Sequence, residues 1–162
     1  METRHDIGQL HTRWVFGQLT TTLRQQVMAF WLREGALTSH DEAWRRSWEV
    51  AAVLQCASTG DMAGICTVAV SLDEHGRGCG VLRVFIGAAY RRSGVATRVV
   101  KCAIAGFQAL VHEPGAPLRL VATIENRKLG RAGGQRLLAS VGLRPTGRTP
   151  QGQLMVEHRL VD

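Results

Sequence analysis

A short stretch at residues 90–97, YRRSGVAT, combines residue types that bind anions. Two arginines precede a glycine, and the residues after the glycine open an amphipathic helix. The first N–H groups of a helix have no partner inside it and carry a partial positive charge. Gly94 lets an anion approach the backbone, while Arg91 and Arg92 add positive charge. The stretch therefore predicts a phosphate-binding site at a helix start.

Other phosphate-binding and metal-binding motifs are absent from the sequence. A P-loop needs Gly-Lys-Ser/Thr, and neither Lys101 nor Lys128 follows a glycine. The segment GRGCG at 76–80 precedes a predicted strand rather than a helix, so it does not fit a dinucleotide-binding fingerprint. None of the four cysteines lies in a C-x-x-C pair, and we therefore expect no metal site.

Hydrophobic spacing predicts the elements that position this stretch. We expect a strand at 9–16, helices at 20–37 and 38–48, strands at 49–56, 62–72 and 81–87, a loop at 73–80, a helix at 94–111 and a strand at 118–126. The stretch 127–141 starts with a glycine-rich basic segment and is helical at its end, and a connection with room for a short strand leads to a last strand at 153–160. Ser39, with Glu42 three residues later, is typical of a helix N-cap. This order predicts an α/β (α+β) fold with a mixed, largely antiparallel sheet.

Composition bounds the class of protein. A chain of 162 residues with 45% hydrophobic residues fits a single globular domain over 1–162, with no membrane span and a cytoplasmic location. The cysteines at 56, 66 and 102 lie in apolar runs, and we expect buried, reduced thiols there. The net charge of +7 allows a nucleic-acid partner. The arginines are spread along the chain, however, which favours a solvated basic surface.

The stretch Arg91–Ala96 resembles the pyrophosphate-binding motif Arg/Gln-x-x-Gly-x-Gly/Ala of the GCN5-related N-acetyltransferase (GNAT) family. The element order over 20–160 is similar to that fold. TIENRK places Asn126 where the family often has an asparagine, and LLASVGLRPTGRT resembles its helix-to-strand ending. The resemblance implies helices on both faces of the sheet and a central V-shaped splay between the parallel strands at 81–87 and 118–124.

The resemblance also implies acetyl-CoA as cosubstrate, without a metal. The residues expected to contact it are Phe85, Ile86 and Gly87 along the pantetheine arm, Arg91, Arg92, Ser93, Gly94, Val95, Ala96 and Thr97 around the pyrophosphate, and Asn126 at the end of the next strand. The backbone N–H groups from Arg92 to Ala96, with Thr97, would hold the pyrophosphate. An N–H near Ile86 would stabilise the oxyanion.

The catalytic groups depart from the family pattern. Many members carry a tyrosine about four residues before the glycine that ends the last helix, and Leu138 occupies that position here. The strand at 81–87 has no carboxylate, and Arg83 is its only charged residue. Glu125 is the best candidate for the general base. Glu74 and His75, in the 73–80 loop, are weaker candidates.

The implied reaction is direct attack by an amine of a small molecule or protein on acetyl-CoA in a ternary complex. An acetyltransferase acting on RNA-linked amines, such as aminoacyl-tRNA, is one alternative. A non-catalytic CoA-binding protein of the same fold is another, since the usual acid is missing. The resemblance also allows a homodimer.

Overall fold

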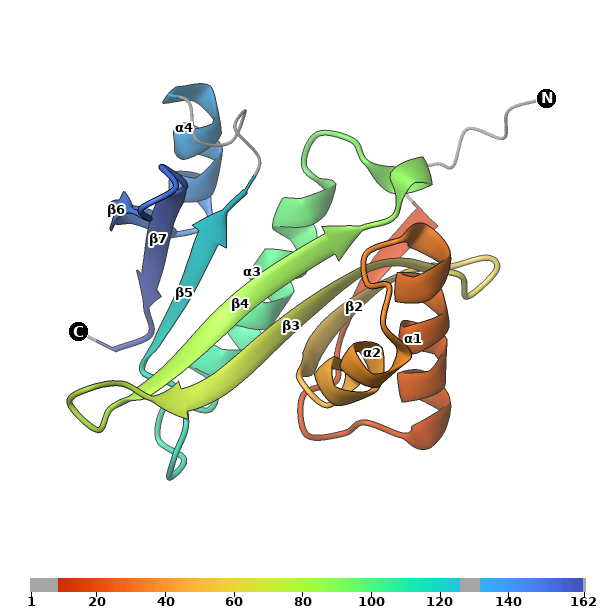
Figure 1. Cartoon of the computed structure of the whole chain (residues 1–162), viewed down its shortest axis with the longest axis horizontal. Helices are drawn as coiled ribbons and strands as arrows, with labels where there is room; N and C mark the ends of the chain where they lie inside the picture. The colour runs from red at the N-terminus through yellow and green to blue at the C-terminus, as the bar shows by residue number, and fades with distance from the viewer. Residues whose placement is uncertain (1–8, 126–131, 162) are drawn as a thin grey trace. The chain divides into compact units, whose positions relative to one another are not determined.

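The computed structural model describes residues 9–125 and 132–161 (Figure 1). The strands are β1 (Leu10–Trp14), β2 (Val50–Cys56), β3 (Met62–Leu72), β4 (Gly78–Ile86), β5 (Arg119–Ile124), β6 (Arg144–Arg148) and β7 (Leu154–Arg159). The helices are α1 (Thr21–Glu34), α2 (His40–Ser47), α3 (Val95–Gln108) and α4 (Ala132–Ser140), with a short 3-10 helix η2 (Ala88–Tyr90). No helix in these ranges is long and apolar enough to cross a membrane.

The strands form one sheet in the order β1-β2-β3-β4-β5-β7-β6. The pairs β1–β2, β2–β3, β5–β7 and β6–β7 are antiparallel, whereas β4 and β5 are parallel. The prediction of a mixed, largely antiparallel sheet is therefore confirmed. Pairing between β4 and β5 covers Cys79 to Val81 opposite Arg119 to Val121, although both strands continue further. The β4–β5 pairing therefore stops before either strand ends, and these are the two strands between which the V-shaped splay was predicted.

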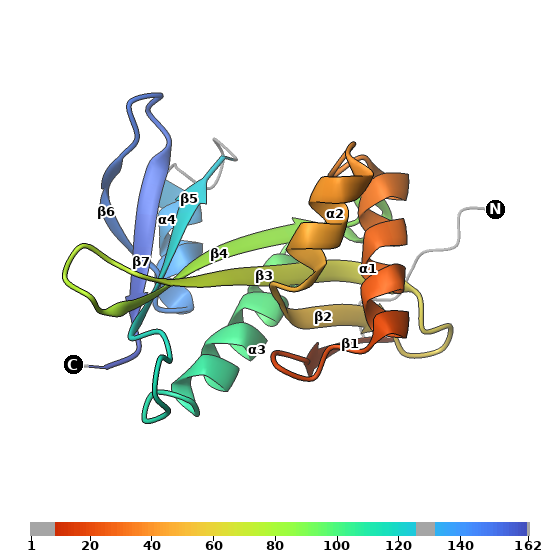
Figure 2. The same ribbon diagram turned by 60° about the horizontal axis from the view of Figure 1, so that its bottom comes forward.

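The chain forms two compact units, Met1–Val68 with Arg83–Gly106, and Ala69–Leu82 with Phe107–Asp162. The prediction of a single domain over 1–162 stays a prediction. In the first unit, α1 and α2 cover one face of β2 and β3, and α3 lies on the other face (Figure 2). Phe30, Trp31 and Ile65 belong to the core on the α1–α2 face, while Leu54 and Val95 belong to a second core cluster.

Local sequence signals account for the early helices. The Thr20 side chain accepts from the Leu23 N–H, and the Ser39 side chain accepts from the Glu42 N–H at 3.3 Å, which confirms the N-cap predicted there. Gly35 ends α1 in the left-handed conformation at φ +73°. The apolar residues of α1 recur at helical spacing and are buried, and they are Leu23, Val27, Phe30 and Trp31.

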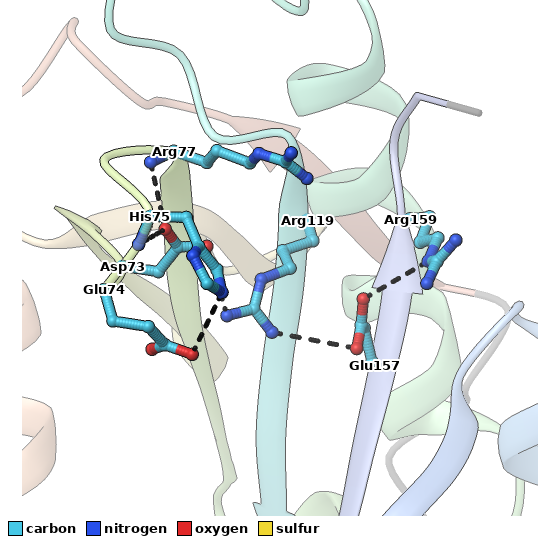
Figure 3. A network of polar contacts seen from close by, with 7 residues as sticks. All are labelled: Asp73, Glu74, His75, Arg77, Arg119, Glu157 and Arg159. Carbon is cyan, nitrogen blue, oxygen red and sulfur yellow. Dashed lines mark hydrogen bonds and ion pairs between the residues drawn. The ribbon is translucent and has the colours of Figure 1, made fainter.

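An ion-pair network ties strands of the second unit together (Figure 3). Arg119, the first residue of β5, lies 3.5 Å from the Asp73 carboxylate and 3.7 Å from the Glu157 carboxylate of β7. Glu157 also pairs with Arg159 at 3.6 Å. Hydrogen bonds from the Arg77 backbone, then from that of His75, hold the pKa of Asp73 below its usual value, and the Arg119 charge lowers it further. The network fixes the end of β5 that pairs with β4.

Two details of the sequence prediction are wrong. The loop expected at 73–80 ends earlier, because Gly78 already begins β4 and accepts a hydrogen bond from the Leu118 N–H at 2.9 Å. A Cβ at Gly78 would collide with the Ala116 carbonyl, so this glycine permits close approach of two backbones rather than a flexible turn. All four cysteines are free thiols, but Cys102 is only half-buried, whereas Cys79, in the predicted loop, is buried.

Candidate functional site

The start of α3 has the backbone geometry of an anion-binding turn. The helix begins at Val95, directly after Gly94, whose φ of +86° lies in the left-handed region. Apart from its two chain neighbours, no described residue would lie within 4 Å of a Cβ added at Gly94, so this side of the turn is open. No acidic residue lies in the first helical turn. The positive end of the helix dipole therefore has no carboxylate of its own helix beside it.

The N–H groups of this turn divide into engaged and available donors. The Arg92 N–H donates to the Tyr90 carbonyl at 2.9 Å, and the Val95 N–H donates to the Arg92 carbonyl at 3.2 Å. Of the N–H groups from Arg92 to Thr97, those of Ser93, Gly94, Ala96 and Thr97 donate to no acceptor among the described residues. Of the N–H groups that we expected to hold the pyrophosphate, those of Arg92 and Val95 are therefore already used by hydrogen bonds within the turn.

The two arginines of the motif differ in their surroundings. Arg91 folds back over β4, where its Nε donates to the Ile86 carbonyl at 3.0 Å and its guanidinium carbon lies 5.3 Å from the centre of the Phe85 ring. Arg92 is exposed. Tyr90 is buried in the core, and burial raises the pKa of its hydroxyl, as expected for an aromatic residue with a packing role.

Backbone alternation selects which residue of the predicted pantetheine-binding segment faces outward. The Gly87 N–H donates to the Ala63 carbonyl of β3 at 2.8 Å. Successive residues of a strand direct their backbone groups to opposite edges, so Phe85 also faces β3. Ile86 faces the other edge, which pairs with β5 only from Cys79 to Val81. Its carbonyl already holds Arg91, and its N–H points to the edge where an added strand or an oxyanion can bind.

The predicted catalytic carboxylate lies in the other unit. Glu125 is exposed and directly follows β5. The exposed Glu74 carboxylate lies 3.6 Å from Nε2 of His75 in the β3–β4 loop, and both residues belong to the same unit as Glu125. Asn126 lies outside the described residues. Leu138 of α4 is buried, so its position provides packing and no proton.

Sequence reasoning missed a carboxylate near the end of β4. Glu34, the last residue of α1, accepts the Ala88 N–H at 3.3 Å, immediately after the segment expected to bind pantetheine. No sequence signal could have shown this, because the two residues lie far apart in the chain and meet only through the packing of α1. The described residues contain no group of three or more histidine, cysteine, aspartate or glutamate side chains that could hold a metal ion.

Comparison with solved structures identifies the fold. A GNAT-family acetyltransferase from Streptococcus pneumoniae aligns with a TM-score of 0.65 at 16% identity, covering 94% of this chain and 99% of that chain. The ribosomal-protein-S5-alanine acetyltransferase from Vibrio fischeri aligns with a TM-score of 0.68 at 12% identity, covering 97% and 96%. The Salmonella typhimurium protein yncA, solved with its cofactor acetyl-CoA, aligns with a TM-score of 0.61 at 15% identity, covering 95% of each.

These alignments extend over almost the whole length of both chains. No protein-family model and no curated protein matches the sequence itself. The likeness is therefore one of structure, at identities where the fold persists after most side chains have changed. The chain has the fold of the GNAT acetyltransferases, as the motif at Arg91–Ala96 predicted.

Proposed function

We propose that this protein is an N-acetyltransferase that transfers the acetyl group of acetyl-CoA to an amine of a small molecule or protein. The observation that carries the proposal is the set of backbone donors at the start of α3. They lack internal acceptors, lie beside Gly94 and two arginines, and occur on a fold shared with acetyltransferases. Two of the solved neighbours point the same way, one bound to acetyl-CoA and one named for a ribosomal-protein acceptor.

In this proposal the cofactor lies along β4 and ends at α3. The pyrophosphate would accept hydrogen bonds from the N–H groups at the start of α3, and Arg92 would add a mobile positive charge. The pantetheine arm would pair with the outward edge of β4 at Ile86, displacing Arg91 from the Ile86 carbonyl. Arg91, once released, can itself turn toward a phosphate.

Acetyl-CoA supplies an acetyl group activated as a thioester. The acceptor amine, in its neutral form, forms the new C–N bond at the carbonyl carbon, and the C–S bond then breaks. The Ile86 N–H would donate to the oxyanion that develops between these two events. The amine's proton passes to a base or through water, and the departing thiolate takes a proton from solvent, because Leu138 stands where an acid is usual.

We assign the base to Glu125. It is an exposed carboxylate at the end of the strand that neighbours β4, and no carboxylate occurs on β4 itself. A carboxylate in that role accepts the proton as the amine attacks, or orients a water molecule that does so. Glu34 is held by the Ala88 N–H, and we assign it a role in positioning the turn after β4.

The proposal is tested by calorimetric titration with acetyl-CoA, followed by an assay of thiol release with a panel of amines. We expect binding below about 1 mM, the upper end of ordinary substrate affinities, and amine-dependent thiol release. No binding at that concentration would refute the cofactor site.

A non-catalytic CoA-binding protein is the second candidate. It is favoured by one observation, the buried Leu138 at the position of the usual acid. Tight binding of acetyl-CoA without amine-dependent thiol release, across primary amines and peptide N-termini, would support this candidate over the enzyme.

A further inference from the structure

Arg83 of β4 and Arg46 of α2 lie together at the face of β3 and β4 that α2 covers. In the β3–β4 hairpin, the Asp73 N–H donates to the Arg77 carbonyl near the loop, and the Gly87 N–H donates to the Ala63 carbonyl at the far end. Both bonds fit one unbroken antiparallel register, which places Arg83 directly opposite Thr67. Directly opposed side chains project from the same face of the sheet, about 5 Å apart at Cβ.

Arg46 extends from α2 toward the opposed side chains of Thr67 and Arg83. Its terminal nitrogen donates to the Thr67 hydroxyl at 3.3 Å, and its guanidinium carbon lies 5.5 Å from the centre of the buried Trp31 ring. The Arg46 Nε is buried and has no hydrogen-bond partner. Burial lowers the pKa of Arg46, and the positive charge of Arg83 is the next largest cause. Because Arg46 donates to Thr67 and Arg83 lies directly opposite Thr67, the two positive charges face the same part of the sheet and repel each other.

Neither arginine has a counter-ion in the part of the chain that the structure describes. No carboxylate of the described residues lies within ion-pair distance of Arg46 or Arg83. The more distant carboxylates of Glu42 and Glu49 raise the pKa of Arg46, and the neighbouring charge of Arg45 lowers it. Arg83 is exposed, whereas Arg46 is half-buried and fixed by Thr67 and Trp31. An anion placed here would offset the repulsion and meet one half-buried and one exposed guanidinium.

This arginine pair is also close to the proposed reaction centre. Phe85 packs against the α1–α2 core, so Arg83, two residues earlier, projects from the same face. At about 3.3 Å per residue, Arg83 lies roughly 7–10 Å along β4 from Phe85 and Ile86. An acceptor that reaches from Arg83 to the oxyanion donor would carry its anionic group several bonds from its amine.

We propose that Arg46 and Arg83 recognise a carboxylate of the acceptor, so that the substrate is a small amine with a carboxylate roughly 7–10 Å from the reacting nitrogen. This inference rests on the proposed acetyl transfer. Arg46 orients the carboxylate beside Thr67, and Arg83 closes over it from the open side. The net positive charge of the chain also favours an anionic acceptor over a polycationic one.

The probes are 6-aminohexanoate and 6-aminohexanamide, which differ only in the charge at the end remote from the amine. We expect the carboxylate to have a KM about 10- to 100-fold below that of the amide at similar kcat, the range of one charge-assisted hydrogen bond. Arg83→Gln should raise the KM of the carboxylate toward that of the amide, with the part of the difference due to Arg46 remaining, and should leave the KM of the amide unchanged. The exposed neighbour Arg45 provides the matched control, and Arg45→Gln should change neither.

Equal KM values for the two probes in the parent protein would overturn the inference while leaving acetyl transfer intact. The same holds if Arg83→Gln affects both probes alike. Arg46→Lys, which keeps the charge but loses the planar fork, should weaken the carboxylate alone.

A direct binding experiment distinguishes failure of the proposed acetyl transfer from failure of the arginine site. If acetyl-CoA does not bind or no acetyl transfer is seen, 6-aminohexanoate is titrated directly into the parent and into Arg83→Gln. Binding that the substitution abolishes would support the arginine site without the enzyme, and no binding to the parent would overturn it.

Discussion

Gly94 allows the folding role and the binding role of the anion site to be measured separately. At its φ of +86°, an L residue costs about 1–2 kcal/mol relative to glycine. Apart from its two chain neighbours, no described residue would lie within 4 Å of the added Cβ, so no steric clash adds to that cost. For a chain of 162 residues, Gly94→Ala should therefore lower the melting temperature by about 2–8 °C.

The effect on the cofactor should be larger and of a different kind. The added methyl group would occupy the open side of the turn, where the pyrophosphate of the proposed cofactor would approach the backbone donors. Loss of one hydrogen bond to a charged group, worth about 1.5–3 kcal/mol, weakens binding roughly 10- to 150-fold. Calorimetric titration of acetyl-CoA into Gly94→Ala, at a temperature well below its melting point, measures this loss.

Gly115 provides the matched control. Its φ is +77°, and an added Cβ there would also meet nothing within 4 Å, but it lies in the loop before β5 and outside the predicted cofactor site. Gly115→Ala should lower the melting temperature by a similar amount and leave acetyl-CoA affinity unchanged. If both variants bind acetyl-CoA as the parent does, the phosphate site is not at Gly94 and the reasoning from the motif is refuted.

Three further predictions concern ionisable groups. Glu125→Gln should keep cofactor affinity and lower kcat about 10²- to 10⁴-fold, and this loss should shrink as pH rises. Glu34→Gln should not lower kcat in this pH-dependent way. An unchanged pH–rate profile in Glu125→Gln would exclude Glu125 as the base. The pKa of Asp73 is lowered in the folded protein, so its ionised carboxylate stabilises the fold above about pH 4, and this stabilisation is lost as pH falls through the folded pKa. The difference in unfolding free energy between the parent and Asp73→Asn should therefore shrink only below about pH 4. Urea titrations at a series of pH values measure that difference. Hydrogen bonds, first that from the Ser58 side chain, lower the pKa of Cys56 to about 7, so its alkylation rate should have a midpoint near that pH, and Ser58→Ala should move the midpoint upward.

Local chemistry made several features predictable from the sequence. The N-cap at Ser39 and the stripe of α1 depend on residues within one or two helical turns. The turn at Gly94 likewise depends on its own backbone, since glycine alone adopts the left-handed region without cost. Such interactions form wherever their few residues occur together, so the position of the proposed phosphate site was readable before any fold was known.

The tertiary structure decided what lies beside these local features. Gly78 is in a strand because a distant backbone approaches it, and this overrides the turn preference of its sequence. Arg24 is buried between the rings of Trp44 and Trp48, where composition alone would place an arginine in water.

The same is true of the groups that would choose and activate the acceptor. Arg46, Thr67 and Arg83 meet only because β3 pairs with β4 in one register and α2 packs over that face. Glu34 reaches Ala88 only through the packing of α1. Contacts between residues so far apart in the chain depend on the pairing register and on helix packing, which many sequences satisfy in different ways. The residues of the proposed cofactor motif were thus predictable from their order in the chain, whereas the surroundings of the proposed acceptor depend on the fold.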